Sequence, residues 1–177
     1  EQEVNFDHLK KYISLIKRRK NKEPVSNITK KKFFWDSEYL INNEVLAPRF
    51  ETEHLVEHVI KIFKTSNKLN IIDIGVGSGC ILISLLKEKK NWVGTGVDIS
   101  KFAIKVAKNN AKIQQVNNRI RFIHSDVDKL VHGKYDLIVS NPPYINKVGY
   151  NNLDLDVKNY EPKMALYGGT DGFRIIE

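Results

Sequence analysis

LNIIDIGVGSG, residues 69–79, is the stretch that decides the fold of this chain. Its first six residues are mostly apolar, which is typical of a strand buried in a parallel sheet. Gly75, Gly77 and Gly79 follow at once, and glycine lets the backbone turn sharply so that a helix can begin against the strand. We therefore expect a strand over 69–74, a tight turn, and a helix over 79–89.

The same pattern of a strand followed by a helix recurs along the chain. Further strands are expected over 92–97, 120–124 and 135–140, and further helices over 101–114 and 127–131. Apolar strands that alternate with amphipathic helices indicate an α/β fold with a parallel sheet and helices on both faces. In a doubly wound sheet the first and fourth strands are neighbours, and ligands bind in the crevice between their carboxyl ends.

Two further strands end in an acidic residue. Asp98 closes WVGTGVD, residues 92–98, and Asp126 closes RFIHSD, residues 121–126. A carboxylate at the end of the second strand can accept hydrogen bonds from both ribose hydroxyls of a nucleoside ligand. A side chain at the end of the third strand can receive an adenine amino group. Each aspartate alone also fits a helix cap, but such groups at three consecutive strand ends favour a nucleoside cofactor.

The sequence pattern of the glycine-rich turn distinguishes between two classes of cofactor. Its pattern from Asp73, DxGxGxG, differs from the dinucleotide pattern GxGxxG, and it lacks the Gly-Lys-Ser/Thr ending of a phosphate-binding loop. Because no lysine stands where phosphates would require one, we interpret the cofactor as S-adenosylmethionine rather than NAD.

Asn141-Pro142-Pro143-Tyr144 follows the fourth strand, which places it beside the glycine-rich turn and the sulfonium methyl of the cofactor. The Asn141 side-chain carbonyl and the Pro142 backbone carbonyl can accept both N–H groups of a planar amide or aromatic amine. The prolines stiffen the turn and remove competing N–H donors, and Tyr144 can stack on the target. We expect a nitrogen-methylation site, although a rigid turn after a strand would also explain these residues.

The segments before the first strand give further signals. Residues 1–20 have apolar positions at helical spacing and end in the basic cluster KRRK, which could meet RNA or complement the helix dipole. Segments 32–35 and 39–41 flank a turn as in a short hairpin. APRFETE, residues 47–53, leads into a helix for which Thr52 is the natural N-cap.

That helix contains HLVEH, residues 54–58, which matches the inverted zincin pattern HxxEH. His54 and His58 would face the same side of a helix and could hold a metal. No third ligand is evident downstream, and an amphipathic helix with exposed histidines explains the pattern, so we assign no metal.

Together these motifs resemble the N5-glutamine methyltransferase (HemK/PrmC) family. The likeness covers most of the chain, at Glu23-Pro24, 48–53, 73–79, Asp98, 141–144 and 168–172. It implies a Rossmann-like class I S-adenosylmethionine-dependent methyltransferase fold. It also implies a cytoplasmic transferase of translation termination that methylates the Gly-Gly-Gln glutamine of a peptide chain release factor, its protein partner.

The resemblance assigns roles to individual residues. The methionine part of the cofactor is expected on Gly75, Val76, Gly77, Ser78 and Gly79, with Asp73 and Asn141 beside it, the ribose on Asp98 and the adenine between Asp126 and Val127. The side-chain amide of the substrate glutamine is expected on Asn141 and Pro142, in a site completed by Pro143 and Tyr144. The family often has a second proline at Phe50 and an aromatic residue at Val127, so adenine packing differs here.

We expect three parts: 1–22 as the remnant of an N-terminal helical substrate-binding domain, 23–47 as a linker with the hairpin, and 48–177 as the catalytic domain. Because the family's sheet continues beyond the helix expected near Asp171, we expect the sheet to be truncated after its fourth strand, which would be an exposed edge. Glu1 rather than Met opens the chain, and we expect a native protein that is longer at both ends.

Composition narrows the class of protein and of partner. The 29 Lys and Arg residues against 21 Asp and Glu give a net charge of +8, which favours acidic or nucleic-acid-containing partners or marks solvated lysine-rich faces. Contact with RNA or the ribosome through these basic residues is therefore an open expectation. Cys80 stands alone, which fits a reducing cytoplasm, and no apolar run reaches the roughly 18 residues that span a membrane.

Glutamine methylation is the leading hypothesis, and three alternatives remain. An N6-adenine nucleic-acid methyltransferase could use the same residues, 141–144, to hold the amino group of a flipped base. The chain could also be part of a bifunctional protein fused to a tRNA guanine-N7 methyltransferase, or a non-catalytic fragment that acts as an interaction module. The segment 48–53 favours the glutamine enzyme.

Overall fold

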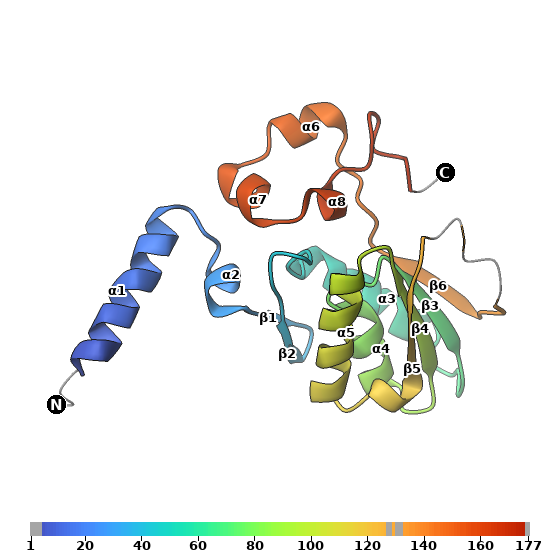
Figure 1. Ribbon diagram of the computed structural model, residues 1–177. Helices are drawn as coiled ribbons and strands as arrows, with labels where there is room; N and C mark the ends of the chain where they lie inside the picture. The colour runs from blue at the N-terminus through green and yellow to red at the C-terminus, as the bar shows by residue number, and fades with distance from the viewer. Residues whose placement is uncertain (1–4, 127–128, 130–132, 176–177) are drawn as a thin grey trace.

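The computed structural model describes residues 5–126, 129 and 133–175. Its centre is a four-stranded parallel sheet of order β5-β4-β3-β6 (Figure 1). The strands are β3 (Asn70–Ile74), β4 (Val93–Asp98), β5 (Ile120–His124) and β6 (Leu137–Ser140). β3 and β6, the first and fourth strands of this sheet in chain order, are neighbours, with Ile74 opposite Ser140. The predicted α/β fold and the predicted adjacency of these two strands are therefore confirmed.

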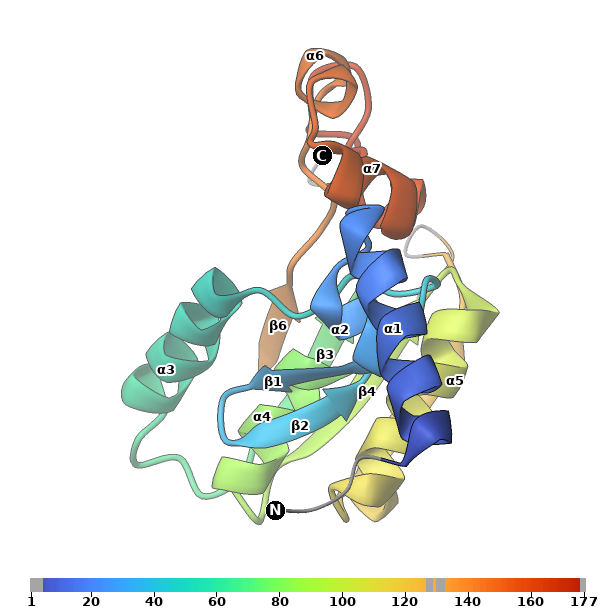
Figure 2. The ribbon, with the colours of Figure 1, turned by 90° about the vertical axis from the view of Figure 1, so that its left-hand side faces the viewer.

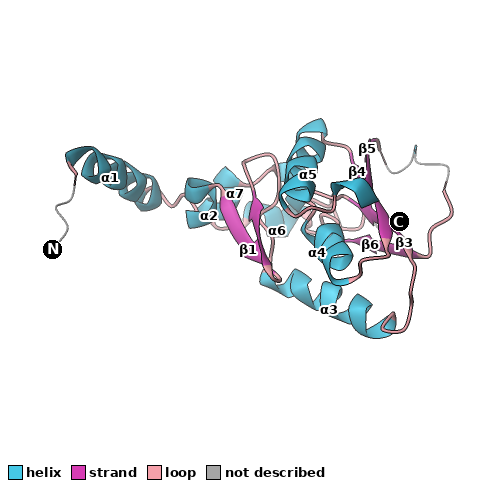
Figure 3. Ribbon diagram, turned by 90° about the horizontal axis from the view of Figure 1, so that it is seen from below, coloured by secondary structure: helices cyan, strands magenta, loops and turns pink. Residues whose placement is uncertain are grey.

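Three helices cover one face of this sheet: α3 (Glu53–Ile62), α4 (Cys80–Glu88) and α5 (Lys101–Ile113) (Figure 3). Helices were expected on both faces, and in the described part of the chain this expectation is met on this face alone (Figures 1 and 3). The central helix α4 is apolar on nearly every side and buries its residues 81–86 between the sheet and its neighbours. The helix expected over 127–131 falls mostly outside the described residues. Short 3₁₀ turns, η1 (Phe50–Thr52) and η2 (Asn117–Arg119), precede α3 and β5.

The expected hairpin is present as β1 (Lys31–Phe34) and β2 (Ser37–Leu40), which pair antiparallel. Trp35 was expected in the first strand, but it lies in the turn with a left-handed φ of 56°. Phe34 and Tyr39 are fully buried in the cluster that contains α4, and the Tyr39 hydroxyl lies 2.8 Å from Ser84 Oγ. The hairpin thus packs over α4 (Figure 2).

Helix α1 (Phe6–Lys20) is present as expected and extends away from the rest of the molecule (Figures 1 and 3). The structure describes all of α1, and none of its residues is buried. Its apolar side chains, among them Phe6 and Tyr12, are 68% and 61% exposed. A short helix, α2 (Val25–Thr29), joins it to the hairpin.

The segment after Tyr144, for which no helix was expected, is helical in the structure. It forms α6 (Lys147–Asn151), α7 (Leu155–Tyr160) and α8 (Lys163–Leu166), a lobe beyond the carboxyl end of β6 (Figure 1). Local capping explains part of this, because the Asn146 side chain accepts the N–H of Gly149 at 2.8 Å. The helix expected near Asp171 is absent from the described residues, where 171–175 form turns.

No helix of the described residues combines the length and the apolar character needed to cross a bilayer. In the described part of the chain β6 has one neighbouring strand, β3, and its residue Ile138 is 63% exposed.

Candidate functional site

The glycine-rich turn after β3 has the backbone that only glycine adopts readily. Gly75, Gly77 and Gly79 have φ values of 75°, 53° and 84°. At Gly79 a Cβ would also lie 2.8 Å from Ile83 Cδ1, whereas at Gly75 it would meet nothing within 4 Å. Gly79 is therefore required for close packing of α4, and Gly75 leaves open space above the turn.

Asp98 holds this turn in place from the end of the neighbouring strand. Its Oδ2 accepts the N–H of Gly77 at 2.9 Å, and its Oδ1 accepts the N–H of Ser100 at 2.8 Å. Each carboxylate oxygen has a second lone pair, so Asp98 can still accept hydrogen bonds from ribose hydroxyls. Asp98 therefore lies beside the turn, and its role at the ribose stays a prediction.

Asp73, the last acidic residue before the turn, is 1% exposed. Neither of its carboxylate oxygens has a hydrogen-bond partner among the described residues. The pKa of Asp73 is raised to about 7, chiefly by burial; the backbone of Leu82 opposes the shift and the nearby charge of Asp98 adds to it. A buried carboxyl without a partner beside an open glycine turn is the kind of group that a cationic ligand would satisfy.

These residues fit the cofactor that the sequence indicated. Gly75 and Gly77 offer a surface without side chains, and Asp98 offers acceptors at the adjacent strand end. Asp126 is half-buried two residues after β5, at the same edge of the sheet. Val127, which was expected to flank the adenine, lies outside the described residues.

Asn141 follows directly after β6, as Gly75 follows directly after β3. Because Ile74 and Ser140 are paired, the two residues leave the sheet side by side, and the Ser140 hydroxyl donates to the Ile74 carbonyl at 2.7 Å. The Asn141 side-chain N–H donates to Thr52 Oγ1 at 3.2 Å. This bond uses the amide N–H and leaves the carbonyl Oδ1 as an acceptor.

Thr52 therefore has a different role from the one its sequence predicted. Its side chain makes no capping hydrogen bond to α3, although it occupies the N-cap position. The hydroxyl is taken by Asn141, which is 89 residues further along the chain. Short-range sequence patterns carry no signal for a partner at that separation.

Asn141, Pro142 and Tyr144 line a cleft of about 420 Å³ between α3 and the C-terminal lobe. Thr52 and Arg49 lie at its polar end, and its apolar lining comes from Leu55, Leu153, Val157 and Leu166. Tyr144 is 66% exposed, so its ring is available to a planar group that enters from solvent. The cleft thus brings together three of the expected site residues.

A loop from the C-terminal lobe supports the Asn-Pro-Pro-Tyr segment from behind. The N–H of Gly168 donates to the Ile145 carbonyl at 2.9 Å, and Ile145 forms a parallel bridge with Tyr167. A Cβ at Gly168 would collide with the Pro143 carbonyl, and one at Gly172 would lie 2.5 Å from the Tyr144 carbonyl. The sequence contained these glycines, but only their backbone contacts reveal that they support the site.

Two other supporting groups were not predicted. Arg49 Nη2 contacts Glu161 Oε2 at 2.5 Å, with the Glu161 side chain only 4% exposed. Burial raises the pKa of Glu161, and Arg49 opposes that shift. The ion pair joins the segment before α3 to the C-terminal lobe, and so fixes two sides of the cleft.

The second is Asn110 of α5, which is 1% exposed. Its side-chain N–H groups donate to the carbonyls of Ser78 and Leu40 at 2.8 and 2.9 Å, and its oxygen accepts the N–H of Leu40 at 2.8 Å. Asn110 therefore ties the glycine-rich turn to the end of β2.

The histidines of the HxxEH pattern lie on the outside of α3. His54 is 3.9 Å from Glu57, and its side chain is 73% exposed. Within residues 5–126, 129 and 133–175, no group of three or more His, Cys, Asp or Glu side chains is placed to hold a metal ion.

Comparisons with known proteins agree with this geometry. Residues 51–155 match the family model described as methyltransferase small domain. The chain is 39% identical over 171 residues to the release factor glutamine methyltransferase of Caulobacter vibrioides, covering 96% of this chain and 59% of that protein. It is 38% identical over 190 residues to the bifunctional methyltransferase of Rickettsia typhi, covering 97% of this chain and 37% of that protein.

Among solved structures, a SAM-dependent methyltransferase from Agrobacterium tumefaciens shares the fold, with a TM-score of 0.54 and 22% identity over 64% of this chain and 39% of that one. The chain spans about three fifths, or less, of the length of the two relatives named above.

Proposed function

Because the chain belongs to the methyltransferase small domain family and has release factor glutamine methyltransferases among its relatives, we propose that it methylates a protein glutamine with S-adenosylmethionine. The substrate we propose is the glutamine of the Gly-Gly-Gln loop of a peptide chain release factor. The relatives' names support a release factor as the protein partner.

One observation carries this proposal: the Asn141 amide is oriented by Thr52 at the strand end beside the glycine-rich turn. An amide nitrogen is a poor nucleophile because its lone pair is delocalised into the carbonyl. The Asn141 Oδ1 and the Pro142 carbonyl can accept its two N–H groups, which orients the nitrogen and stabilises the positive charge that develops on it. Pro142 and Pro143 have no N–H to compete for these acceptors.

The cofactor, when bound on the glycine-rich turn, supplies an electrophilic methyl group on a sulfonium sulfur. Residues of this chain then position the acceptor. The cleft walls from α3 and the C-terminal lobe exclude water from one side of the substrate amide, and the exposed Tyr144 ring can stack on its plane. We propose Asp98 for the ribose and Asp126 for the adenine, at the same edge of the sheet. Val127, which lies outside the described residues, stays a proposed second contact of the adenine.

We also propose that the chain has three functional parts. Residues 48–177 carry the transfer site, and residues 23–47 connect it to the N-terminal part. Residues 1–22, which include α1, belong to a helical unit that helps to present the protein substrate. The exposed apolar side chains of α1 support this role, because they offer contact area that the described body does not cover.

The decisive experiment is methyl transfer from labelled S-adenosylmethionine by the full-length protein. The acceptors are a release factor, the same factor with its Gly-Gly-Gln glutamine changed to alanine, duplex DNA and tRNA. We expect label on the first acceptor and none on the other three. Label on DNA or tRNA with none on the release factor would replace the proposal with nucleic-acid methylation.

A further inference from the structure

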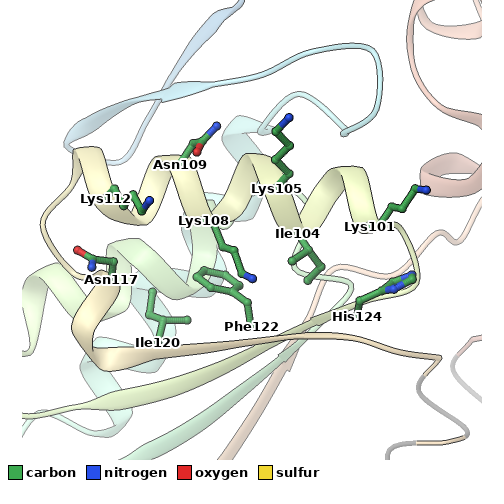
Figure 4. Close-up of a pocket in the computed structure, with 10 residues that line it drawn as sticks. All are labelled: Lys101, Ile104, Lys105, Lys108, Asn109, Lys112, Asn117, Ile120, Phe122 and His124. Carbon is green, nitrogen blue, oxygen red and sulfur yellow. The ribbon is translucent and has the colours of Figure 1, made fainter.

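A second hollow lies on the outer edge of the sheet and shares no lining residue with the cleft at Asn141. It has a volume of about 620 Å³ and runs between α5 and β5. Ile104, Ile120 and Phe122 form its apolar floor (Figure 4). Asn109, Asn117 and His124 lie on its rim. Four lysines of α5 also line it: Lys101, Lys105, Lys108 and Lys112.

The charge of this region is unbalanced in sequence as well as in space. Residues 99–124 contain six Lys or Arg residues and no Asp or Glu, although the whole chain has 21 acidic residues. One of the six, Arg119, has a structural role, since its guanidinium donates to the carbonyls of Leu86, Lys89 and Trp92. The four lysines of the groove have no ion pair with an acidic residue of the described chain.

Helix α3 offers a local contrast to α5 in how its lysines are spaced relative to acidic residues. There Lys61 contacts Glu57 at 2.7 Å, one turn away on the same helix. On α5 the positions one turn apart are instead lysine and lysine, at 101 and 105 and again at 108 and 112. Like charges at this spacing destabilise a helix by a few tenths of a kcal/mol for each pair. An anionic ligand along the groove would relieve that repulsion.

The four lysines form a line rather than a cluster. They are spaced by four, three and four residues, so they extend over about 16 Å of helix at about 1.5 Å per residue. A single phosphate ion would need donors that converge on one point. A membrane surface is flat, whereas this region is hollow. A linear array of cations above an apolar floor suits a strand that carries charges at regular intervals.

The floor and rim of the groove favour single-stranded nucleic acid over an acidic peptide as the linear polyanion. Phe122 is half-buried and packs against core residues, and its ring lies below Lys108 in Figure 4. An aromatic ring under a basic rim is how proteins hold the bases or sugars of single-stranded nucleic acid. Exposed amides of Asn109 and Asn117 add donors and acceptors for the same groups. Lysine, a point charge on a flexible stem, suits sequence-independent contacts with phosphate. An acidic peptide would leave the aromatic floor without a matching surface.

We propose that the groove between α5 and β5 binds the phosphodiester backbone of a single nucleic-acid strand, at a site separate from methyl transfer. RNA and DNA share this chemistry, and the test distinguishes them. The proposal does not depend on the identity of the methyl acceptor.

The test measures binding of the whole chain to fluorescent 20-nucleotide oligo(U) and oligo(dT) by anisotropy between 50 and 200 mM salt, with a 20-residue polyglutamate as the third probe. Neutralising four phosphates of a single strand predicts a slope of log K against log salt of about −2.8. Changing Lys101, Lys105, Lys108 and Lys112 together to Gln should weaken oligonucleotide binding at least tenfold at 50 mM salt and bring the slope close to zero.

The matched control changes Lys10, Lys11, Lys17 and Lys20 of α1 to Gln, which removes the same charge from another helix. We expect it to keep most of the affinity, and circular dichroism with thermal melting verifies that both variants fold. A preference for oligo(U) over oligo(dT) would identify RNA as the ligand, and equal binding would support a general strand site. The proposal is wrong if the α1 variant alone loses binding, if polyglutamate binds as tightly as either oligonucleotide, or if neither oligonucleotide binds.

Discussion

In the cleft beside Asn141 several polar side chains have a partner, whereas the lysines of the α5–β5 groove have no ion pair to a described residue. The partnered side chains of the cleft are Arg49, Thr52, Ser140 and Asn141. Thr52 accepts a hydrogen bond from Asn141, and Glu161 forms an ion pair with Arg49. Gly168 lets the backbone of the C-terminal lobe pack against Pro143. In the groove the floor is packed, but none of the four lysines has such an ion pair with an acidic residue of the described chain. The contacts of the cleft fix the positions of individual side chains, whereas the groove presents a row of positive charges. Substitutions should therefore have large, local effects in the first and graded, salt-dependent effects in the second.

Asn141→Ala should have the largest effect, a fall in the rate of methyl transfer of about 10³-fold. Removal of a single positioned group that stabilises developing charge has effects of about 10²–10³-fold in other enzymes. Cofactor binding, measured by calorimetry, should change little. Asn152→Ala, at an exposed amide of the same lobe, is the matched control and should leave the rate unchanged.

Asp98→Ala should show the reverse pattern, with cofactor affinity reduced about 10–100-fold because the carboxylate also holds the N–H of Gly77. Loss of cofactor binding in the Asn141 variant and its retention in the Asp98 variant would overturn this division of roles.

Asp73 should make the stability of the protein depend on pH. Its pKa is raised to about 7 in the folded state, above its usual value near 4, so the folded chain keeps a proton that the unfolded chain has lost. Stability is therefore full below about pH 4, falls as the pH rises through about 7, and then levels off. The total fall is about 4 kcal/mol, at about 1.4 kcal/mol per pKa unit over a shift from 3.8 to about 7. Asp73→Asn should remove most of this dependence when urea unfolding is compared at pH 5 and pH 8. An unchanged slope in that variant would show that another group titrates.

Thr52→Val should reduce the rate of methyl transfer about fivefold, which corresponds to about 1 kcal/mol for one lost hydrogen bond. The variant keeps the shape of the side chain but leaves the Asn141 amide without its acceptor. Thr52→Ser should retain the rate. The melting temperature should be nearly the same in all three proteins, because the hydroxyl does not cap α3. A loss of stability without a loss of rate would restore the capping role that the sequence predicted.

Lys108→Gln should have the smallest effect, a twofold to threefold loss of oligo(U) affinity in anisotropy titrations. The salt slope should become less steep by about 0.7, the value for one phosphate contact. Methyl transfer should not change. A loss of affinity that is the same at 50 and 200 mM salt would mean that the lysine acts by packing rather than by charge, and would weaken the contrast between the two hollows.

The sequence predicted the parts of the fold that depend on continuous apolar runs and on local backbone geometry. The four strands, the glycine-rich turn and the adjacency of β3 and β6 follow from such signals, and all are confirmed. The lobe after Tyr144 was missed because its three helices have four to six residues each. Helices so short are held by caps and tertiary contacts rather than by their own periodicity.

The site was predictable only where its residues lie at strand ends. Asn141 and Asp98 were found because parallel strands bring their carboxyl ends together. Asn110 resembled a surface residue of an amphipathic helix, and nothing near it in the sequence indicates that Ser78 and Leu40 would use its amide. The charge of the groove was visible in the sequence as an excess of lysine, but its alignment along one helix and its apolar floor required the structure.

The hydrogen bonds of Asn110 have a mechanical consequence. Both N–H groups and the oxygen of its amide are engaged, one on the glycine-rich turn and two on the end of the hairpin, so these two segments cannot shift independently without breaking a buried bond. The hairpin continues towards α1, while the turn supports the proposed cofactor site. The two segments are therefore joined through the Asn110 amide. If ligands at the two segments are coupled through it, each must change the affinity of the other by the same factor.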